Sequence, residues 1–464
     1  MECRKASVAP PPMAAIVTIG LTLTAIYVLA LFYLMETTKF DTWGALLLAP
    51  ILIALSIPIL RRQAVREGNR STFRILVVAL LVKLAAALVR FYAGLLFYGG
   101  GADASSYAKW GVKLSSQFRH FDFATGLRSL RGTDFIRLAT GAVFTVIGSS
   151  RIAGYVFFSW LGFWGLFLCY RAFVLAVPEG RRRSYAHLLL FLPSLVFWSS
   201  SIGKEAWMTF AIGIAVFGVA RLLVRWSFGG LIALVVGLAL AGVVRPHMAA
   251  LIAVSFAAAL VTRRSKSELR ELAPVVKGAG ILTVAVLALV LVVNASHFLT
   301  NAGIDVNKGV AGALSGVQDR TGSGGGSDFA PAIVDSPVRL PIATVTVLFR
   351  PLIFEAHNTQ ALLAGIEGTA LMLLCLVRIR WVLAALRSMR RQPFVVFCLV
   401  YTILFIVAYS GFANFGLLAR ERVQLYPLFL VLLSIPRADD RRGSEVQSEV
   451  QSEVESVEQT ATTT

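Results

Sequence analysis

Cysteine, histidine and acidic residues are scarce in this sequence. Its 464 residues include 4 cysteines and 5 histidines, and 25 aspartates and glutamates stand against 44 lysines and arginines. Cys169, Cys375 and Cys398 lie inside apolar runs, and Cys3 lies at the start of the chain. This spacing fits neither a disulfide framework nor a zinc site, so the sequence predicts no disulfide staple and no cysteine-bound metal.

A long basic soluble segment is also missing, although the formal net charge is +19. The basic residues fall in short clusters between apolar runs, at 61–74, 181–183, 263–270 and 378–391. Such clusters are typical of cytoplasmic loops under the positive-inside rule. We therefore predict no nucleic-acid partner, because nucleic-acid binding needs a basic surface on a soluble face.

Apolar residues are abundant instead, at 57% of the chain, and runs of them recur along most of its length. A run of about 20 apolar residues is long enough to cross a bilayer as a helix. Porin-like strands would need sustained alternation of apolar and polar residues, which the sequence lacks. The predicted fold class is therefore an all-α, polytopic membrane helical bundle.

The predicted topology has twelve transmembrane helices and two cytoplasmic termini. The first apolar run is too long for the core of a signal peptide, so we interpret it as an uncleaved signal anchor. The twelve predicted spans cover about 13–35, 44–60, 75–98, 152–176, 185–200, 206–224, 229–244, 248–262, 278–294, 360–378, 393–409 and 423–436.

Two further apolar stretches, 135–148 and 338–354, do not fit as spans. Counting either as a crossing would move a basic cluster to the outer side, against the positive-inside rule. We predict that both are re-entrant or interfacial helices on the outer face. The membrane bundle then covers residues 1–436, with large outer loops at 99–151 and 295–359. The acidic, repetitive tail at 437–464 is predicted to be disordered and cytoplasmic.

Charged side chains recur in the predicted outer connections, where lysine and arginine should be depleted. Arginine grips phosphate through a planar fork of donors, so several arginines at one membrane face would hold a lipid pyrophosphate. A nearby carboxylate could deprotonate a sugar hydroxyl that attacks an anomeric carbon. The candidate outer residues are Asp103, Tyr107, Lys204, Glu205, Arg245, His247, Arg350, Glu355, His357, Asn414, Arg420, Glu421 and Arg422.

Each candidate also has a structural interpretation. Asp103 could cap a helix, and Lys204 with Glu205 could form a solvated pair. Arginines near span ends, including Arg245, Arg420 and Arg422, could anchor the protein at headgroups. Arg350 with Glu355 could form an ion pair that pins a re-entrant helix.

Two further basic residues, Lys83 and Arg90, lie on one face of the third predicted span. An ionised group at mid-bilayer costs about 2.5–3.5 kcal/mol on insertion scales, so both should face the bundle interior. They either line a groove for lipid phosphate or pair with Glu367, and the pairing is favoured.

Several motifs resemble those of O-antigen polymerase (Wzy) and EpsG-like membrane proteins, over roughly residues 90–435. "GADASSYAKWG" resembles an Asp-x-x-x-Tyr element that opens the first outer loop, and it is similar to the acidic loop motif of GT-C glycosyltransferases. "LPSLVFWSSSIGKEAW", "VVRPHMAALI" and "NFGLLARERVQLYP" follow in the order seen in the polymerases.

This resemblance implies transfer of sugars from polyprenyl-pyrophosphate carriers at the outer face of the bacterial inner membrane. It implies that Asp103 matches the acidic loop residue of the GT-C pattern and is a candidate catalytic base. The chain has a single aspartate where GT-C enzymes have an acidic pair, so Glu355 and His247 remain rival catalytic residues, and no metal or other cofactor is predicted. The predicted phosphate- and substrate-binding residues are Arg245, Arg350, Arg420, Arg422, Lys204, Tyr107 and His357.

The sequence therefore predicts a glycosyltransferase or polysaccharide polymerase that acts on a polyprenyl-phosphate-linked glycan. Its expected partners are that glycan, membrane lipids and other proteins of envelope-polysaccharide assembly. The alternative is a transporter or flippase of lipid-linked glycans, which would favour internal repeats and charges near the midplane. A non-catalytic assembly protein is a third interpretation.

Overall fold

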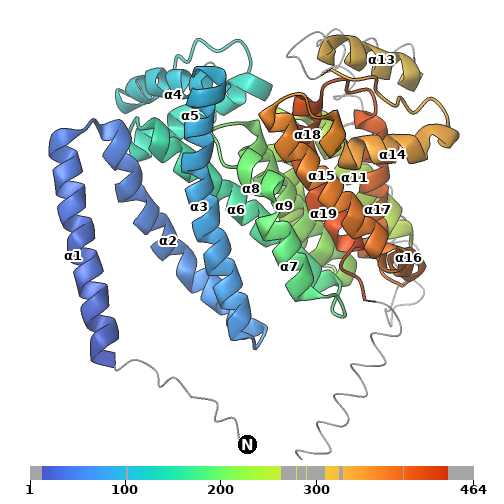
Figure 1. Ribbon diagram of the computed structural model, residues 1–464, viewed down its shortest axis with the longest axis horizontal. Coiled ribbons are helices and arrows are strands. Elements are labelled where there is room, and N and C mark those ends of the chain that lie inside the picture. The colour runs from blue at the N-terminus through green and yellow to red at the C-terminus, as the bar shows by residue number, and fades with distance from the viewer. Residues whose placement is uncertain are drawn as a thin grey trace, which may run out of the picture.

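The computed structural model describes residues 13–100, 103–262, 309–322, 328–389 and 391–436, together with the single residues 278 and 289. Within these ranges the regular structure is helical, and the only strand-like feature is an isolated bridge between Asp328 and Asn414. The predicted all-α class is confirmed. Figure 1 shows long helices that run side by side, with shorter helices lying across one end of the bundle.

Six helices in the described part of the chain are long and apolar enough to cross a membrane. A seventh candidate is the pair α16 (Ile379–Ser388) and α17 (Pro393–Tyr409), which is bent by 118°. The chain is therefore a membrane protein, but the predicted count of twelve spans is not confirmed. The six segments are Gly20–Thr37, Phe40–Arg66, Arg70–Phe97, Arg151–Ala176, Lys204–Val224 and Thr359–Val377.

The difference arises where the predicted spans are short or contain proline. The predicted span at 185–200 is divided into α7 (Arg182–Phe191) and α8 (Pro193–Trp198), because Pro193 has no amide hydrogen to continue the helix. The spans at 229–244 and 248–262 form α10 (Phe228–Val244) and α11 (Pro246–Thr262), each of 17 residues. Such a helix is about 26 Å long, less than the roughly 30 Å of a bilayer core.

The last predicted span, 423–436, also differs from a single crossing. It contains the end of the short turn η4 (Arg422–Gln424) and the seven-residue helix α19 (Tyr426–Leu432). The predicted span at 278–294 and the predicted tail at 437–464 lie outside the described residues, apart from positions 278 and 289.

Three long helices form the N-terminal side of the bundle: α1 (Met13–Thr37), α2 (Phe40–Arg66) and α3 (Arg70–Tyr98). The turn between α2 and α3 is capped by Asn69, whose side chain accepts a hydrogen bond from the Ser71 amide at 2.8 Å. Large apolar side chains such as Leu29, Ile51 and Val89 are exposed on these helices. Exposed apolar surface of this kind is expected where a helix faces lipid.

The centre of the bundle is a close-packed layer of α6 (Arg151–Ala176), α9 (Lys204–Val224) and α10. A Cβ atom added at Gly165 on α6 would lie 2.2 Å from the Thr209 carbonyl oxygen on α9, and one at Gly237 on α10 would lie 2.4 Å from the Ala215 amide nitrogen. Small residues that let backbones approach so closely are typical of helix packing in membranes. The body of α9 is thus closely packed between α6 and α10.

Two helices, α4 (Asp103–Arg119) and α5 (Gly132–Ile147), form a hairpin across one end of the bundle (Figure 1). On α4, Tyr107 and Leu114 are buried at 3% and 0% exposure. A Cβ at Gly111 would lie 2.6 Å from Thr140 of α5, so the two helices interlock. The stretch predicted to be interfacial at 135–148 is therefore a helix of this hairpin.

The other stretch predicted to be interfacial, 338–354, consists of short elements and one ten-residue helix. It is too short to span a bilayer as a single helix. The elements of the C-terminal half are α13 (Gly309–Thr321), η2 (Pro337–Arg339), α14 (Leu340–Phe349), η3 (Ile353–Glu355), α15 (Thr359–Val377) and α18 (Phe415–Glu421), with α16, α17, η4 and α19 as given above.

The basic clusters that the structure describes meet at the other end of the bundle. The Arg183 guanidinium donates to the Ser71 hydroxyl at 2.9 Å, and Arg378 donates to Ser184 at 2.9 Å. Arg181 lies over the Trp381 ring at 4.1 Å. The α4–α5 hairpin and α18 lie at the opposite end (Figure 1). The described basic clusters therefore lie at the end of the bundle away from the α4–α5 hairpin.

Candidate functional site

A cavity of about 460 Å³ lies at the end of the bundle that carries α4 and α18. Its wall is built from α3, α4, α6, the α8–α9 junction, α15 and α18, which are far apart in the sequence. This volume is within the range of small-molecule sites. The polar and aromatic side chains that line it are Arg90, Asp103, Tyr107, Tyr155, Trp198, Ser201, Glu205, Asn358, Gln360, Asn414, Phe415 and Arg420.

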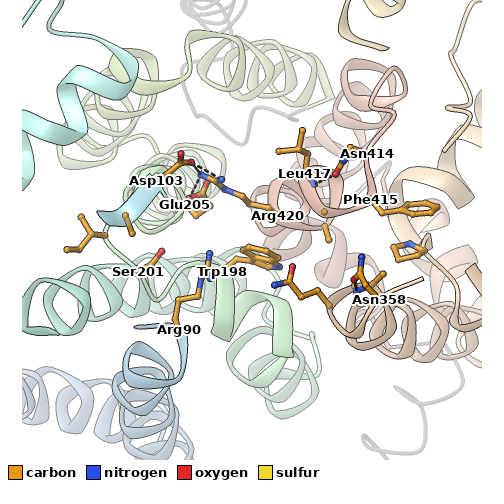
Figure 2. Close-up of a pocket in the computed structure, with 18 of the residues that line it drawn as sticks. Arg90, Asp103, Trp198, Ser201, Glu205, Asn358, Asn414, Phe415, Leu417 and Arg420 are labelled. Atoms are coloured by element: carbon orange, nitrogen blue, oxygen red, sulfur yellow. Dashed lines mark hydrogen bonds and ion pairs between the residues drawn. The ribbon is translucent and has the colours of Figure 1, made fainter. Parts of the chain in front are cut away.

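Arg420 lies between two carboxylates at this cavity, as Figure 2 shows. Its two terminal nitrogens each donate to one Asp103 oxygen at 3.1 Å. On the other side, Nε lies 2.7 Å from one Glu205 oxygen and a terminal nitrogen donates to the second at 3.1 Å. Glu205 raises the pKa of the Arg420 guanidinium above its ordinary value, so this group is a permanent cation.

The charge network continues from Glu205 into the interior. Arg245 donates to Glu205 at 3.2 Å and to Glu421 through both terminal nitrogens. Glu421 also accepts a hydrogen bond from Gln424 at 2.6 Å. Positive and negative groups therefore alternate from the cavity to the core, which is the arrangement that makes buried charge tolerable.

Local backbone structure positions these charges. Asp103 and Glu205 both lie in the first turn of a helix, α4 and α9, where the helix dipole favours a negative charge. Arg420 lies in the last turn of α18, where the dipole favours a cation. Asn414 caps α18 by accepting a hydrogen bond from the Leu417 amide at 3.1 Å. Asp103, Glu205 and Arg420 thus each lie at the helix end that stabilises their charge.

The break between α8 and α9 is held by the buried Lys83 of α3. Its ammonium group donates to the Leu195 and Val196 carbonyls at 2.9 and 3.0 Å and to the Ser199 hydroxyl at 2.6 Å. The favoured pairing of Lys83 with Glu367 is therefore wrong, and Glu367 instead accepts a hydrogen bond from the Ser194 amide at 2.6 Å. These carbonyls lie in the last turn of α8, where no amide of the same helix donates to them, and Lys83 supplies hydrogen-bond donors instead.

Arg90, two helical turns further along α3, does line the cavity. Its guanidinium lies 4.8 Å from the Phe197 ring centroid and 5.0 Å from that of Trp198, both on α8. These cation–π contacts hold a second guanidinium group across the cavity from Arg420 (Figure 2). Tyr107 lies near Asp103 and Glu205, and burial, together with these carboxylates, raises the pKa of its phenol to about 12.

Arg350 and Glu355 form a separate pair beside the cavity. The guanidinium lies 2.6 Å from the Glu355 carboxylate and 5.0 and 5.3 Å from the stacked rings of Phe329 and Phe415. Partial burial opposes ionisation of Glu355, but hydrogen bonds from Arg350 and the Leu352 amide outweigh it and lower its pKa. Phe415 and Pro351 line the cavity, so the pair braces its wall.

This arrangement predicts that Arg350→Ala and Glu355→Gln have similar effects. Either change breaks the ion pair and loosens the wall, so each should reduce ligand affinity by about five- to twentyfold, equivalent to roughly 1–2 kcal/mol. Binding of a lipid diphosphate to the two purified variants measures this. A loss with Arg350→Ala and wild-type affinity with Glu355→Gln would instead identify Arg350 as a direct ligand.

The remaining predicted residues lie behind or beside the cavity. Lys204 is half-buried next to Glu205, and His357 is exposed next to the lining residue Asn358. His247 contacts the Tyr409 hydroxyl at 3.3 Å inside the bundle. Arg422 is 3% exposed and donates to the Leu348 carbonyl at 3.0 Å. Of the three candidate catalytic residues, only Asp103 lines the cavity.

The sequence did not assign a site role to Glu205, although it is the residue that joins both arginines. Adjacent Lys204 and Glu205 at a helix start also fit a solvated surface pair. Glu205 is in fact buried, with its side chain 4% exposed. Asn414, like Glu205, was a candidate outer residue without an assigned role, and Trp198 and Asn358 were not among the candidates. The polar stretch "SSSIGKE" between two apolar segments is the sequence feature that indicates an interrupted helix beside a polar cavity.

Within the described residues, no group of histidine, cysteine, aspartate and glutamate side chains could hold a metal ion. The carboxylates of the charge network pair with the guanidinium groups of Arg245 and Arg420. No family model, no curated protein and no solved structure matches the chain.

Proposed function

We propose that the protein is an integral membrane glycosyltransferase or polysaccharide polymerase. It would transfer glycan from a polyprenyl-phosphate- or pyrophosphate-linked donor to a sugar hydroxyl at the outer face of a bacterial inner membrane. The observation that carries the proposal is the cavity in which two guanidinium groups, Arg90 and Arg420, lie with the carboxylate of Asp103. These are the group types needed to bind a pyrophosphate and to accept a proton.

The proposed reaction is an inverting displacement at the anomeric carbon. The acceptor hydroxyl oxygen forms the new bond to this carbon, and the bond to the pyrophosphate oxygen breaks. The hydroxyl proton passes to Asp103, and the lipid pyrophosphate leaves with its electron pair. Arg420 and Arg90 would stabilise the charge that grows on the leaving group. The side chains of Trp198 and Tyr155 offer apolar ring faces against which a sugar can pack.

Exposed apolar side chains beside the cavity support a lipid-linked substrate. The helix α3 carries Arg90 and also exposes Val89 and Leu96, while α15 contributes Gln360 to the cavity and exposes Leu363. A ligand could therefore keep its phosphates among the charged groups while its hydrocarbon chain stays along the apolar helices. A soluble sugar nucleotide would gain nothing from that surface.

The decisive experiment uses purified protein in lipid nanodiscs with a radiolabelled polyprenyl-pyrophosphate oligosaccharide. The proposal expects longer glycan products and released polyprenyl pyrophosphate. Movement of the labelled lipid between leaflets of a proteoliposome, with no change in glycan length, would contradict it and support a transporter.

The proposed sidedness has its own test with introduced cysteines. Ser106 on α4 and His357 beside the cavity are accessible, as is Arg62 near the basic end of α2. A membrane-impermeant maleimide added to intact spheroplasts should label Ser106→Cys and His357→Cys, and should label Arg62→Cys only after permeabilisation. The reverse pattern would place the cavity on the cytoplasmic side, away from the proposed substrate.

A further inference from the structure

The two carboxylates that hold Arg420 differ sharply in their surroundings. The Glu205 side chain is 4% exposed and is fixed by a second arginine, Arg245. The Asp103 side chain is 62% exposed and lies at the first residue of α4. Exposed ion pairs contribute little free energy because water and salt compete for both partners. Of the two ion pairs that Arg420 makes, the one with Asp103 is therefore the weaker.

The geometry of this contact is that of a bound anion. Both terminal nitrogens of Arg420 converge on a single Asp103 oxygen, each at 3.1 Å. Phosphate oxygens bind arginine through the same donors at similar distances. Glu205 uses Nε and one terminal nitrogen from the interior side, and so keeps the guanidinium oriented toward the cavity.

We propose that Asp103 occupies the phosphate position of Arg420 in the resting protein, and that the donor's diphosphate displaces it. This inference rests on the proposed function and assigns Asp103 two successive roles. Before binding, its carboxylate neutralises Arg420. After displacement, its carboxylate no longer contacts Arg420 and faces the acceptor hydroxyl as the general base.

The charges of the cavity support this exchange. Two guanidinium groups and two carboxylates line it, so its formal charge is balanced before any ligand binds. A diphosphate that entered with Asp103 in place would add negative charge beside two carboxylates. When Asp103 leaves Arg420 and then takes the hydroxyl proton, one negative charge moves away from the phosphates and is neutralised. The lipid diphosphate leaves last and returns Arg420 to Asp103.

The exchange predicts opposite effects of one substitution on binding and on turnover. Asp103→Asn removes the internal competitor, so a diphosphate should bind about threefold to tenfold more tightly. The same variant lacks the base, so glycan extension should fall at least about a hundredfold. A residue that merely stabilised the fold would weaken both properties together.

The binding experiment uses farnesyl diphosphate and the purified full-length protein in detergent, by isothermal titration calorimetry. The matched control is Asp335→Asn, which removes the same charge and breaks an exposed pair with Arg339 at 3.1 Å. This control should bind farnesyl diphosphate with wild-type affinity. Glu205→Gln should not tighten binding, since Glu205 orients the guanidinium instead of competing for its outer donors.

The outcomes separate the inference from the proposed function. Tighter binding by Asp103→Asn alone supports the exchange. Equal or weaker binding by this folded variant, with wild-type protein that extends glycan, overturns the exchange and leaves the glycosyltransferase proposal standing. Failure of the wild-type protein both to bind the diphosphate and to extend glycan overturns both.

Discussion

Arg420→Ala should reduce glycan extension by at least about a hundredfold while the protein remains folded in the membrane. Arg420 joins Asp103 to Glu205 at the cavity, and it offers its donors to any anion that enters. Loss of a donor that stabilises transition-state charge typically costs about 10²–10³ in rate. The measurement is extension of a labelled lipid-linked glycan by variant and wild-type protein at equal amounts in nanodiscs.

Two companion variants sharpen this prediction. Arg420→Lys keeps the charge but loses the planar fork, so its activity should lie between those of the wild type and the alanine variant. Arg339→Ala removes an exposed arginine of the pair with Asp335 and should leave activity unchanged. Wild-type extension by Arg420→Ala would exclude Arg420 from the phosphate site and with it the proposed chemistry.

Arg422 shows how little sequence spacing reveals about such roles. It lies two positions after Arg420 and was assigned the same role, yet its side chain is buried and donates to the Leu348 carbonyl at 3.0 Å. Two residues along a helix turn a side chain by about 200°, so neighbours in one motif face opposite directions. The motif "ARER" indicates which segment contributes to the site. Only the packing of this segment shows that Arg420 faces the cavity and that Arg422 faces the interior.

The coarse architecture was predictable because it depends on composition and on charge asymmetry. Apolar runs predicted the helical membrane bundle, and the clusters at 61–74, 181–183 and 378–391 do meet at one end. The number of spans was not predictable by length alone. Residues 185–200 have enough apolar character for a helix, but Pro193 divides them and leaves α8 as a short segment in the cavity wall.

The candidate site was predictable as a set of residue types but not as a geometry. Asp103, Tyr107 and Arg420 do line one cavity, although 317 positions separate Asp103 from Arg420. Arg350 and Glu355, in contrast, pair with one another beside this cavity and do not line it. Sequence spacing cannot tell which carboxylate pairs with which arginine, because these partners come together only when distant helices pack.

The interior end of the network should show the largest effect on stability. Arg245 lies between Glu205 and Glu421, and all three side chains are nearly buried. Arg245→Met keeps the volume but leaves two carboxylates without their shared cation. Removal of one partner from a buried ion pair typically costs about 3–5 kcal/mol of unfolding free energy. Denaturant unfolding in detergent micelles measures this loss, with Arg151→Met in the more exposed Arg151–Asp41 pair as the control, expected to lose less than about 1 kcal/mol.

The double variant Arg245→Met/Glu421→Gln should recover much of that stability. The neutral amide introduced at position 421 has no charge to compensate and still presents an oxygen to Gln424, while Glu205 keeps its partner Arg420. The recovery would appear as a coupling energy of about 1–3 kcal/mol between positions 245 and 421. Additive losses would mean that the two groups do not act as one network. A stable double variant that still extends glycan would show that Arg245 contributes to stability and does not touch substrate, since the groups that line the cavity are unchanged in it.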